Sequence, residues 1–303
     1  MAKKSTKTTK TAKNKKTTVS AAVKTKKTAT KKPQVTSSRR TAKKPAKKLT
    51  AVALNKWHKW LAVLLAAQGV AIILLSTAKS IPVTTSFLTK DNLASTTDTT
   101  VLAQAVRHLF DVNLVCVVAG FLFIAALVHI IVATVYRNRY EKELEARVSR
   151  MRWAGGGIIA GLVTTTLALL VGVYDISALA LLFGLVLIAA LAGLAVEVYA
   201  QGPNRRRLAY TILTVSAVLP WVVLGVYLAG AYVYGSGNTP VYVYGAVGSM
   251  FVLFLAACML FILQNRQKGK WSDYLFTERA FMALGFVAMT ALAWQVYAGA
   301  LAP

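Results

Sequence analysis

The chain has 303 residues, 56% of them hydrophobic and 15% charged, and its formal net charge at pH 7 is +26. With a mean hydropathy of +0.54, this composition excludes an ordinary water-soluble protein and indicates a multi-pass membrane protein. The positive charge is unevenly distributed, because residues 1–50 contain eighteen of the 36 Lys and Arg and no Asp or Glu. The remainder of the chain is only mildly basic, so the net charge does not by itself indicate a nucleic-acid-binding protein.

Residues 1–55 are predicted to form a disordered tail. Stretches such as "KTKKTATKKPQ" and "RRTAKKPAKK" are low-complexity Lys, Thr and Ala with Pro, and they have too little apolar surface to offset the entropy of folding. One interpretation is a tether to anionic lipid that also helps to orient the protein. The other is nucleic-acid binding by counterion release, since "TAKKPAKK" is similar to histone tails. No aromatic residues are interleaved to stack on bases, which weakens the second interpretation.

The second predicted domain, residues 56–303, contains apolar segments of about the twenty residues that a bilayer requires. We expect seven transmembrane helices, at about Trp60–Thr77, Leu109–Tyr136, Trp153–Val173, Ala178–Tyr199, Leu208–Ala231, Val241–Leu263 and Phe276–Ala300. The predicted fold class is therefore an all-α membrane protein with a bundle of seven helices.

The short connectors allow a prediction of orientation. "YRNRYEKELEARVSRMR" holds six basic residues, "GPNRRRL" three and "QNRQKGKWSDYLFTER" four, whereas "GVYDIS" and "YVYGSGNTP" hold none. The basic connectors lie on the same side as the tail, and the positive-inside rule places that side in the cytoplasm. The N-terminus is therefore predicted to be cytoplasmic and the C-terminus outside. The first outer connector contains "PVTTSFL", whose β-branched alternation predicts a short strand or hairpin.

Polar groups at membrane depth would mark a site, and few are evident. His129 is the exception, and we interpret it as a residue that hydrogen-bonds a neighbouring helix; a proton-handling role would need a carboxylate partner, which the sequence does not reveal. Gly157 and Gly161 form a Gly-x-x-x-Gly pair typical of close helix packing. Cys116 and Cys258 lie in apolar runs without metal-ligand spacing. With no catalytic set and no metal site, the sequence does not predict an enzyme.

The sequence resembles the heliorhodopsins, a family of seven-helix retinal proteins with a cytoplasmic N-terminus. The resemblance rests on seven segments in collinear order over about 240 residues. These are "AAQGVAIILLS", "PVTTSFL", "MRW", "GVYDISALALLFGL", "VLPWVVLGVY", "GKWSDYLFTERAF" and "LAWQVYAGAL". It implies a rhodopsin-like bundle and a homodimer.

The same resemblance identifies positions in the last and third helices where this chain departs from the family. The family's last helix carries the Lys that forms the Schiff base with retinal, and this chain has Met289 there, with Gly285 in place of a Ser one turn earlier. In the third helix, Arg152 and Trp153 match the family, but the counterion Glu is replaced by Gly155. A thioether cannot form an imine with an aldehyde, and a counterion without its cation would be an unpaired buried carboxylate.

Three further residues complete this degenerate retinal pocket. Ala66 stands where the family usually has a His in the first helix, whereas His129 in the second helix matches the family's His. Trp221 and other aromatic residues would suit an apolar guest, and they would equally suit core packing. The resemblance thus implies that covalent retinal is not a cofactor here.

We therefore expect a non-photoactive membrane protein that binds an apolar, lipid-like ligand or acts as a sensor or scaffold. Two alternatives are a light sensor that binds retinal or a carotenoid noncovalently, and a membrane tether whose basic tail binds nucleic acid or anionic surfaces. Membrane lipid is the expected partner in every case. Met289→Lys should bind retinal poorly or as an unprotonated species, and adding Gly155→Glu should supply the counterion.

Overall fold

The computed structural model describes residues 50–91, 93–95, 99–198, 203–235 and 238–303. The predicted tail, apart from residues 50–55, lies outside them. Among the described residues, seven helices are long and apolar enough to cross a membrane. They are α1 (Ala51–Leu75), α2 (Leu114–Ala133), α4 (Arg150–Leu170), α5 (Ile176–Val198), α6 (Pro203–Tyr234), α7 (Val241–Arg266) and α8 (Tyr274–Val296). The predicted seven-helix class is confirmed.

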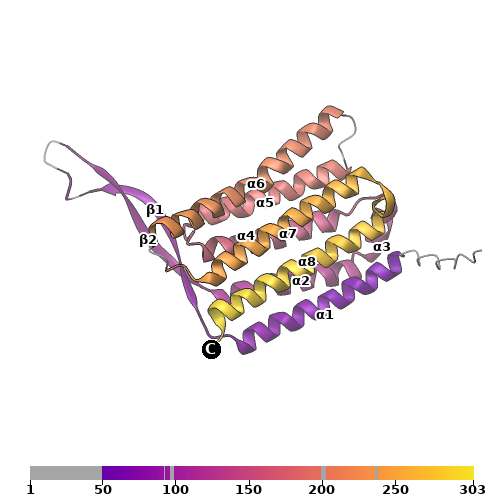
Figure 1. Cartoon of the computed structure of the whole chain (residues 1–303), viewed down its shortest axis with the longest axis horizontal. Helices are drawn as coiled ribbons and strands as arrows, with labels where there is room; N and C mark the ends of the chain where they lie inside the picture. Colours follow the sequence, from indigo (N-terminus) through magenta and orange to yellow (C-terminus); the bar gives the residue numbers. More distant parts are fainter. Residues whose placement is uncertain (1–49, 92, 96–98, 199–202, 236–237) are drawn as a thin grey trace, which may run out of the picture. The chain divides into compact units, whose positions relative to one another are not determined.

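Smaller elements join these helices. They are the antiparallel strands β1 (Ser80–Lys90) and β2 (Leu102–Asn113), the short helix α3 (Arg137–Glu145), the 3-10 turn η1 (Gly269–Ser272) and the π turn η2 (Tyr297–Leu301). Helices that follow one another along the chain pack together, and α8 also packs against α1 and α2. Figure 1 shows this arrangement, with the hairpin projecting from one end of the bundle.

The hairpin confirms one prediction and corrects another. The segment "PVTTSFL" lies in β1, as expected, and Ser80 pairs with Asn113 at the open end of the ladder. Residues 109–113, which were assigned to the second transmembrane helix, belong instead to β2. Their backbone groups bond across to β1, and the Asn113 side chain accepts from the Val115 N–H at the start of α2. An apolar sequence alone did not distinguish this strand from helix.

The first helix begins earlier than predicted. α1 starts at Ala51 rather than near Trp60, and the Thr50 hydroxyl accepts a hydrogen bond from the Ala53 N–H at 3.3 Å. Capping by Thr satisfies one of the free N–H groups of a helix N-terminus. Residues 51–55, assigned above to the tail, are therefore part of the bundle, and this extra length places His58 inside it with 5% of its surface exposed.

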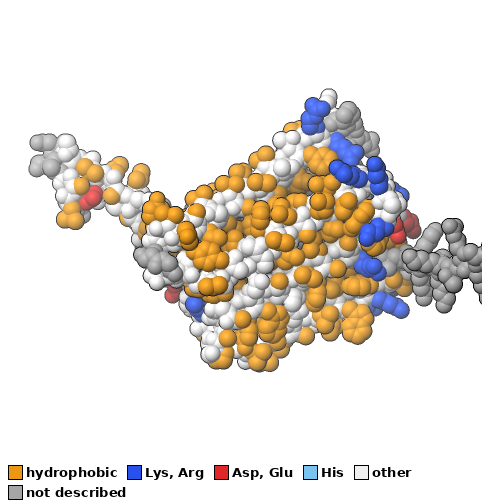
Figure 2. Space-filling view, viewed as in Figure 1, with side chains coloured by type: hydrophobic (Ala, Val, Ile, Leu, Met, Phe, Trp, Pro, Cys, Tyr) orange, Lys and Arg blue, Asp and Glu red, His pale blue; other side chains and the backbone are white. Residues whose placement is uncertain are grey.

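We call the end of the bundle at which α1 begins the basic end, and the opposite end, which carries the hairpin, the sheet end. The connectors from α2 to α4 and from α7 to α8, the end of α5 and the start of α6 lie at the basic end (Figure 1). In the same view, Lys and Arg side chains gather along this end, while hydrophobic side chains cover the middle of the bundle (Figure 2). Lys and Arg are thus concentrated at one end of the bundle, as the number of basic residues in the connectors predicted.

The sheet end is tied together by backbone and carboxylate contacts. The Asp175 carboxylate, just before α5, accepts hydrogen bonds from the N–H groups of Ser177 and Ser86, each at 2.9 Å. The first caps α5, and the second attaches β1 to the bundle. The C-terminus is held at the same end, because the Thr77 N–H donates to the Leu301 carbonyl at 2.7 Å.

Two glycines of α4 allow close packing against α5. A Cβ added to Gly157 would lie 2.6 Å from Ala190 Cβ, and one added to Gly161 would lie 2.6 Å from the Phe183 ring. Both partners are on α5. The Gly-x-x-x-Gly pair therefore lets α4 and α5 approach closely, which confirms the packing role predicted for it.

Candidate functional site

Arg152, in the first turn of α4, is the centre of a buried ionic network. Its side chain is 12% exposed. Nη1 donates to Glu278 Oε2 at 2.7 Å, and Nη2 donates to Glu197 Oε1. Glu197 is in the last turn of α5 and Glu278 in the second turn of α8, and neither side chain is more than 5% exposed. A planar guanidinium can hold two carboxylates at once, so this side chain joins three helices at the basic end.

Neutral hydrogen-bond donors complete the shell around the two carboxylates. Ser149 Oγ donates to Glu278 Oε1 at 2.7 Å, and Gln264 Nε2 donates to Glu197 Oε1 at 2.6 Å. One guanidinium faces two carboxylates, so the three groups carry a net charge of −1 when all are ionised. Burial penalises such an excess charge. The hydrogen bonds from the neutral donors offset part of this penalty.

A chain of hydrogen bonds leads from this network toward the middle of the bundle. Tyr140 Oη donates to Glu278 Oε1 at 3.2 Å. His58 Nε2 lies 3.1 Å from the same hydroxyl, and His58 Nδ1 lies 2.8 Å from His129 Nδ1. Because the tyrosine donates to the carboxylate, it accepts from His58 Nε2–H. Neutral His58 then accepts from His129 Nδ1–H, and these directions form one unbroken chain.

We call this set the Arg152 network. Its members are His58, His129, Tyr140, Ser149, Arg152, Glu197, Gln264 and Glu278. Tyr140 is suited to a relay, because burial and the neighbouring Glu278 raise the pKa of its phenol well above the ordinary value. It therefore keeps its proton at physiological pH. Rearrangement of such a chain can carry a proton between an imidazole and a carboxylate.

This network changes the interpretation of His129. The sequence revealed no carboxylate partner for it, yet the structure connects it to Glu278 through His58 and Tyr140. The predicted hydrogen bond to a neighbouring helix exists, but its partner is an imidazole. The sequence signals were weak because Glu197 and Glu278 lie near helix ends, where charged residues are usually solvated, and because His58 lay before the predicted start of the first helix.

The other predicted pocket residues lie in or beside the main hydrophobic core. Met289 is 5% exposed in that core, and Ala66 and Trp221 pack against it as partly buried residues. The Trp221 ring also packs against Phe251 and Phe254 of α7, with ring centroids 5.2 Å and 5.3 Å apart. These contacts are those of a filled apolar core.

The two glycines of the predicted pocket differ in the space available for a side chain. Gly155 is buried against α2, and a Cβ built on it would lie 2.6 Å from Val128 Cγ1. A Cβ built on Gly285 would meet no atom within 4 Å among the described residues. Gly155 therefore has no room for a larger side chain unless Val128 moves, whereas Gly285 tolerates one.

Two cavities lie away from Met289. A polar cavity of about 250 Å³ opens at the basic end beside Glu197 and Gln264, with Arg147, Arg206 and Trp271 also lining it. An apolar groove of about 490 Å³ runs between α7 and α8. The polar cavity gives the Arg152 network access to solvent at the basic end, and none of the six predicted pocket residues lines either cavity.

A covalent retinal site requires a buried amine, and the described part of the chain offers none. Every Lys in residues 50–303 has an exposed side chain; these are Lys56, Lys59, Lys79, Lys90, Lys142, Lys268 and Lys270. α8 contains no Lys. The described residues also contain no group of three or more His, Cys, Asp and Glu side chains that could hold a metal ion.

A protein-family model for heliorhodopsins matches residues 54–301, from the first turn of α1 to the end of η2. The chain belongs to the heliorhodopsin family. No curated protein matches it at a significant level. As a heliorhodopsin it is a multi-pass membrane protein, in agreement with its seven apolar helices. The Trp and Gln residues of two family segments meet in this heliorhodopsin, since Trp294 Nε1 donates to Gln68 Oε1 at 3.2 Å and links α8 to α1.

Proposed function

We propose that this heliorhodopsin works without covalently bound retinal, as a non-photoactive and non-enzymatic membrane sensor or scaffold. The observation that carries the proposal is the absence of a buried Lys from the described residues. Formation of a Schiff base requires an amine within the bundle. The apolar burial of Met289, at the family's Lys position, supports the same conclusion. The residues present do not fit a covalent retinal cofactor.

The test is pigment formation. The purified protein mixed with all-trans-retinal should show no absorbance band beyond that of free retinal. A visible band that survives borohydride would overturn the proposal in favour of noncovalent chromophore binding. A band that borohydride bleaches would show a Schiff base that we do not expect.

A matched reversal sharpens this test. Gly155→Glu places its Cβ against Val128, so Met289→Lys with Gly155→Glu should form pigment only when Val128→Ala makes room. Met289→Leu with the same two changes is the control, and it should remain colourless. If the triple variant folds normally and gives no pigment, the predicted retinal pocket differs from that of the family at more than these three positions.

The Arg152 network supports the scaffold role. It joins α1, α2, α3, α4, α5, α7 and α8, so loss of the ion pair between Glu278 and Arg152 would loosen contacts among these helices. Glu278→Gln replaces the carboxylate with a neutral amide of similar size, and it should raise amide exchange across α3 at constant pH. Unchanged exchange across α3 would contradict this role.

We also propose that the basic end faces the cytoplasm, by the positive-inside rule. Residues 1–49, which precede α1 in the sequence, carry eighteen Lys and Arg and no aromatic residue to stack on bases, which favours contact with anionic lipid over a role in nucleic-acid binding. Cysteine labelling from outside intact cells should modify a cysteine placed at Lys90 and not one placed at Lys268. The reverse pattern would overturn the orientation. The homodimer implied by the resemblance stays a proposal.

A further inference from the structure

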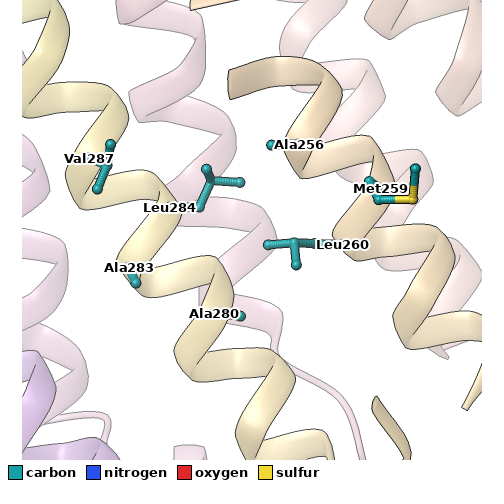
Figure 3. A pocket seen from close by; sticks show the side chains of 7 residues that line it. All are labelled: Ala256, Met259, Leu260, Ala280, Ala283, Leu284 and Val287. Atoms are coloured by element: carbon teal, nitrogen blue, oxygen red, sulfur yellow. The ribbon is translucent and has the colours of Figure 1, made fainter. Parts of the chain in front are cut away.

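The groove between α7 and α8 lies on the outer face of the helix pair. It is lined by Ala256, Met259, Leu260, Ala280, Ala283, Leu284 and Val287. Figure 3 shows Leu260 and Leu284 pointing toward each other across the groove, while the small alanine side chains leave space beside the helix backbones. Met259 and Val287 at its edges are 55% and 49% exposed. The groove therefore opens toward the acyl chains of the bilayer.

Two cations stand at the basic end of this groove. Lys270 Nζ lies 5.3 Å from the centroid of the Phe276 ring, and Arg279 Cζ lies 5.8 Å from the same centroid. Phe276 is four residues before Ala280, so it lies one helical turn below the groove on the same face of α8. The aromatic ring holds both cations near the entrance by cation–π attraction.

Neither cation is neutralised within the described residues. No ion pair joins Lys270 or Arg279 to a described carboxylate. The neighbouring Glu278 turns inward to Arg152, and the Asp273 carboxylate accepts the Leu275 N–H at the start of α8. The entrance to the groove thus presents two uncompensated positive charges at the depth of the headgroups.

We propose that this surface binds a single anionic phospholipid, with its phosphate between Lys270 and Arg279 and one acyl chain in the groove. The groove extends over eight residues of α8, from Ala280 to Val287, or about 10 Å along the helix. It therefore accommodates the part of a chain nearest the headgroup. Charge selects an anionic lipid, because a zwitterionic headgroup brings its own cation toward Lys270 and Arg279.

Photo-crosslinking of the full-length protein tests this site. A phosphatidylglycerol with a diazirine near the top of one acyl chain is added to the delipidated protein in neutral detergent, and crosslinked peptides are mapped by mass spectrometry. Crosslinks are expected in residues 256–260 and 280–287. Unlabelled phosphatidylglycerol should compete for these crosslinks at least tenfold better than phosphatidylcholine with the same chains. Equal competition would overturn the proposal by showing unselective lipid contact.

Two sets of variants separate the site from the general charge of the protein. Lys270→Ala with Arg279→Ala should abolish the preference for phosphatidylglycerol, whereas Arg205→Ala with Arg207→Ala removes the same charge from α6 and should leave it intact. Ala283→Phe fills the groove without altering charge and should remove the mapped crosslinks. The basic tail is unchanged in every variant. If the α6 control loses the preference equally, the tail and surface charge attract the lipid and the site is refuted.

Discussion

The Arg152 network and the core around Met289 lie in the same bundle and are built in opposite ways. The network places an arginine, two glutamates and two histidines within hydrogen-bonding reach of one another or of shared partners, almost out of contact with solvent. Met289 lies in an apolar cluster whose buried members are all hydrophobic. One region contains ionisable groups, and the other contains none at Met289, where the resemblance implies the family's reactive amine.

The difference shows which polar groups depend on a cofactor. The carboxylates of the Arg152 network have all of their partners within the protein, the guanidinium and the neutral hydrogen-bond donors, so they are stabilised whether or not a chromophore is bound. A counterion at position 155 would have its partner only while a Schiff base existed. A bundle that does not form the Schiff base can therefore keep the first region, while the second favours apolar residues. The four predictions below test this contrast, from the largest expected effect to the smallest.

Arg152→Ala should have the largest effect. It leaves two buried carboxylates without a cation, and breaking a buried pair in this way costs about 3–5 kcal/mol of stability. We expect a clear fall in the thermal unfolding midpoint, measured by circular dichroism in detergent. Arg205→Ala removes an exposed arginine of α6 and is the control. Equal midpoints for the two variants would show that the network does not hold the bundle together.

Gly155→Ala should have the next largest effect. The added Cβ meets Val128 Cγ1, and overpacking of this kind typically costs about 1–3 kcal/mol. Gly156→Ala is a matched control on the next residue, where a Cβ meets no atom within 4 Å among the described residues. Its effect should be neutral or stabilising by up to about 1 kcal/mol, because Ala favours helix. The same unfolding measurement compares them, and a neutral Gly155→Ala would contradict the close packing.

Tyr140→Phe should have a smaller effect on stability, of about 1 kcal/mol, since it removes one hydroxyl from the network. It also deprives His58 Nε2–H of its acceptor, so the tautomer equilibrium of His58 should change. With ¹⁵N-labelled histidine, NMR observes only three residues, and His108 on β2 provides an exposed reference. Shifts at His58 and His129 with none at His108 are expected. If His58 keeps its tautomer, the assigned direction of the chain is wrong.

The smallest effect concerns Asp175 at the sheet end. Partial loss of hydration raises the pKa of its carboxyl, but hydrogen bonds from the N–H groups of Ala178, Ser177 and Ser86 outweigh this and hold the pKa below its ordinary value. Its contribution is therefore present above about pH 4 and is lost as the pH falls through the lowered pKa. Below that point the Ser86 amide should lose exchange protection.

Asp175→Asn provides the comparison for this last prediction. It should show the weaker protection of Ser86 already at neutral pH, with no further loss on acidification beyond that of other β1 amides. Protection that does not differ between the two proteins at neutral pH would show that the Ser177 cap and the Ser86 contact do not depend on the carboxylate charge.

The fold was largely predictable because bilayer-length apolar runs separated by charged connectors have few alternatives. The wrong predictions occurred where the sequence is compatible with more than one secondary structure. Residues 109–113 include three apolar residues and run directly into the apolar helix that follows, and pairing with β1 makes them a strand. The true start of α1 depends on Thr50 as a cap, and polar and charged residues interrupt the apolar ones before Leu61.

The candidate site was only partly predictable. The assignment of Met289 to the family's Lys position and the match of His129 to the family's His follow from the resemblance alone and stay predictions. The Arg152 network was not predictable, because its members come from residues 58 to 278 and meet only when the helices pack. Periodicity places Arg152 and Glu278 near helix ends, and it does not show that their side chains turn inward.

The contact between Gly155 and Val128 makes the order of substitutions matter. If Gly155 replaced a glutamate, as the resemblance implies, then the valine methyl group now occupies space that the glutamate Cβ would need. Reversion at position 155 alone would be harmful before it could be useful, and so would a lysine without its counterion. Variants with only one of these reversions should therefore be less stable than both the present chain and a pigment-forming variant. The packing around Gly155 thus disfavours a stepwise return to a pigment.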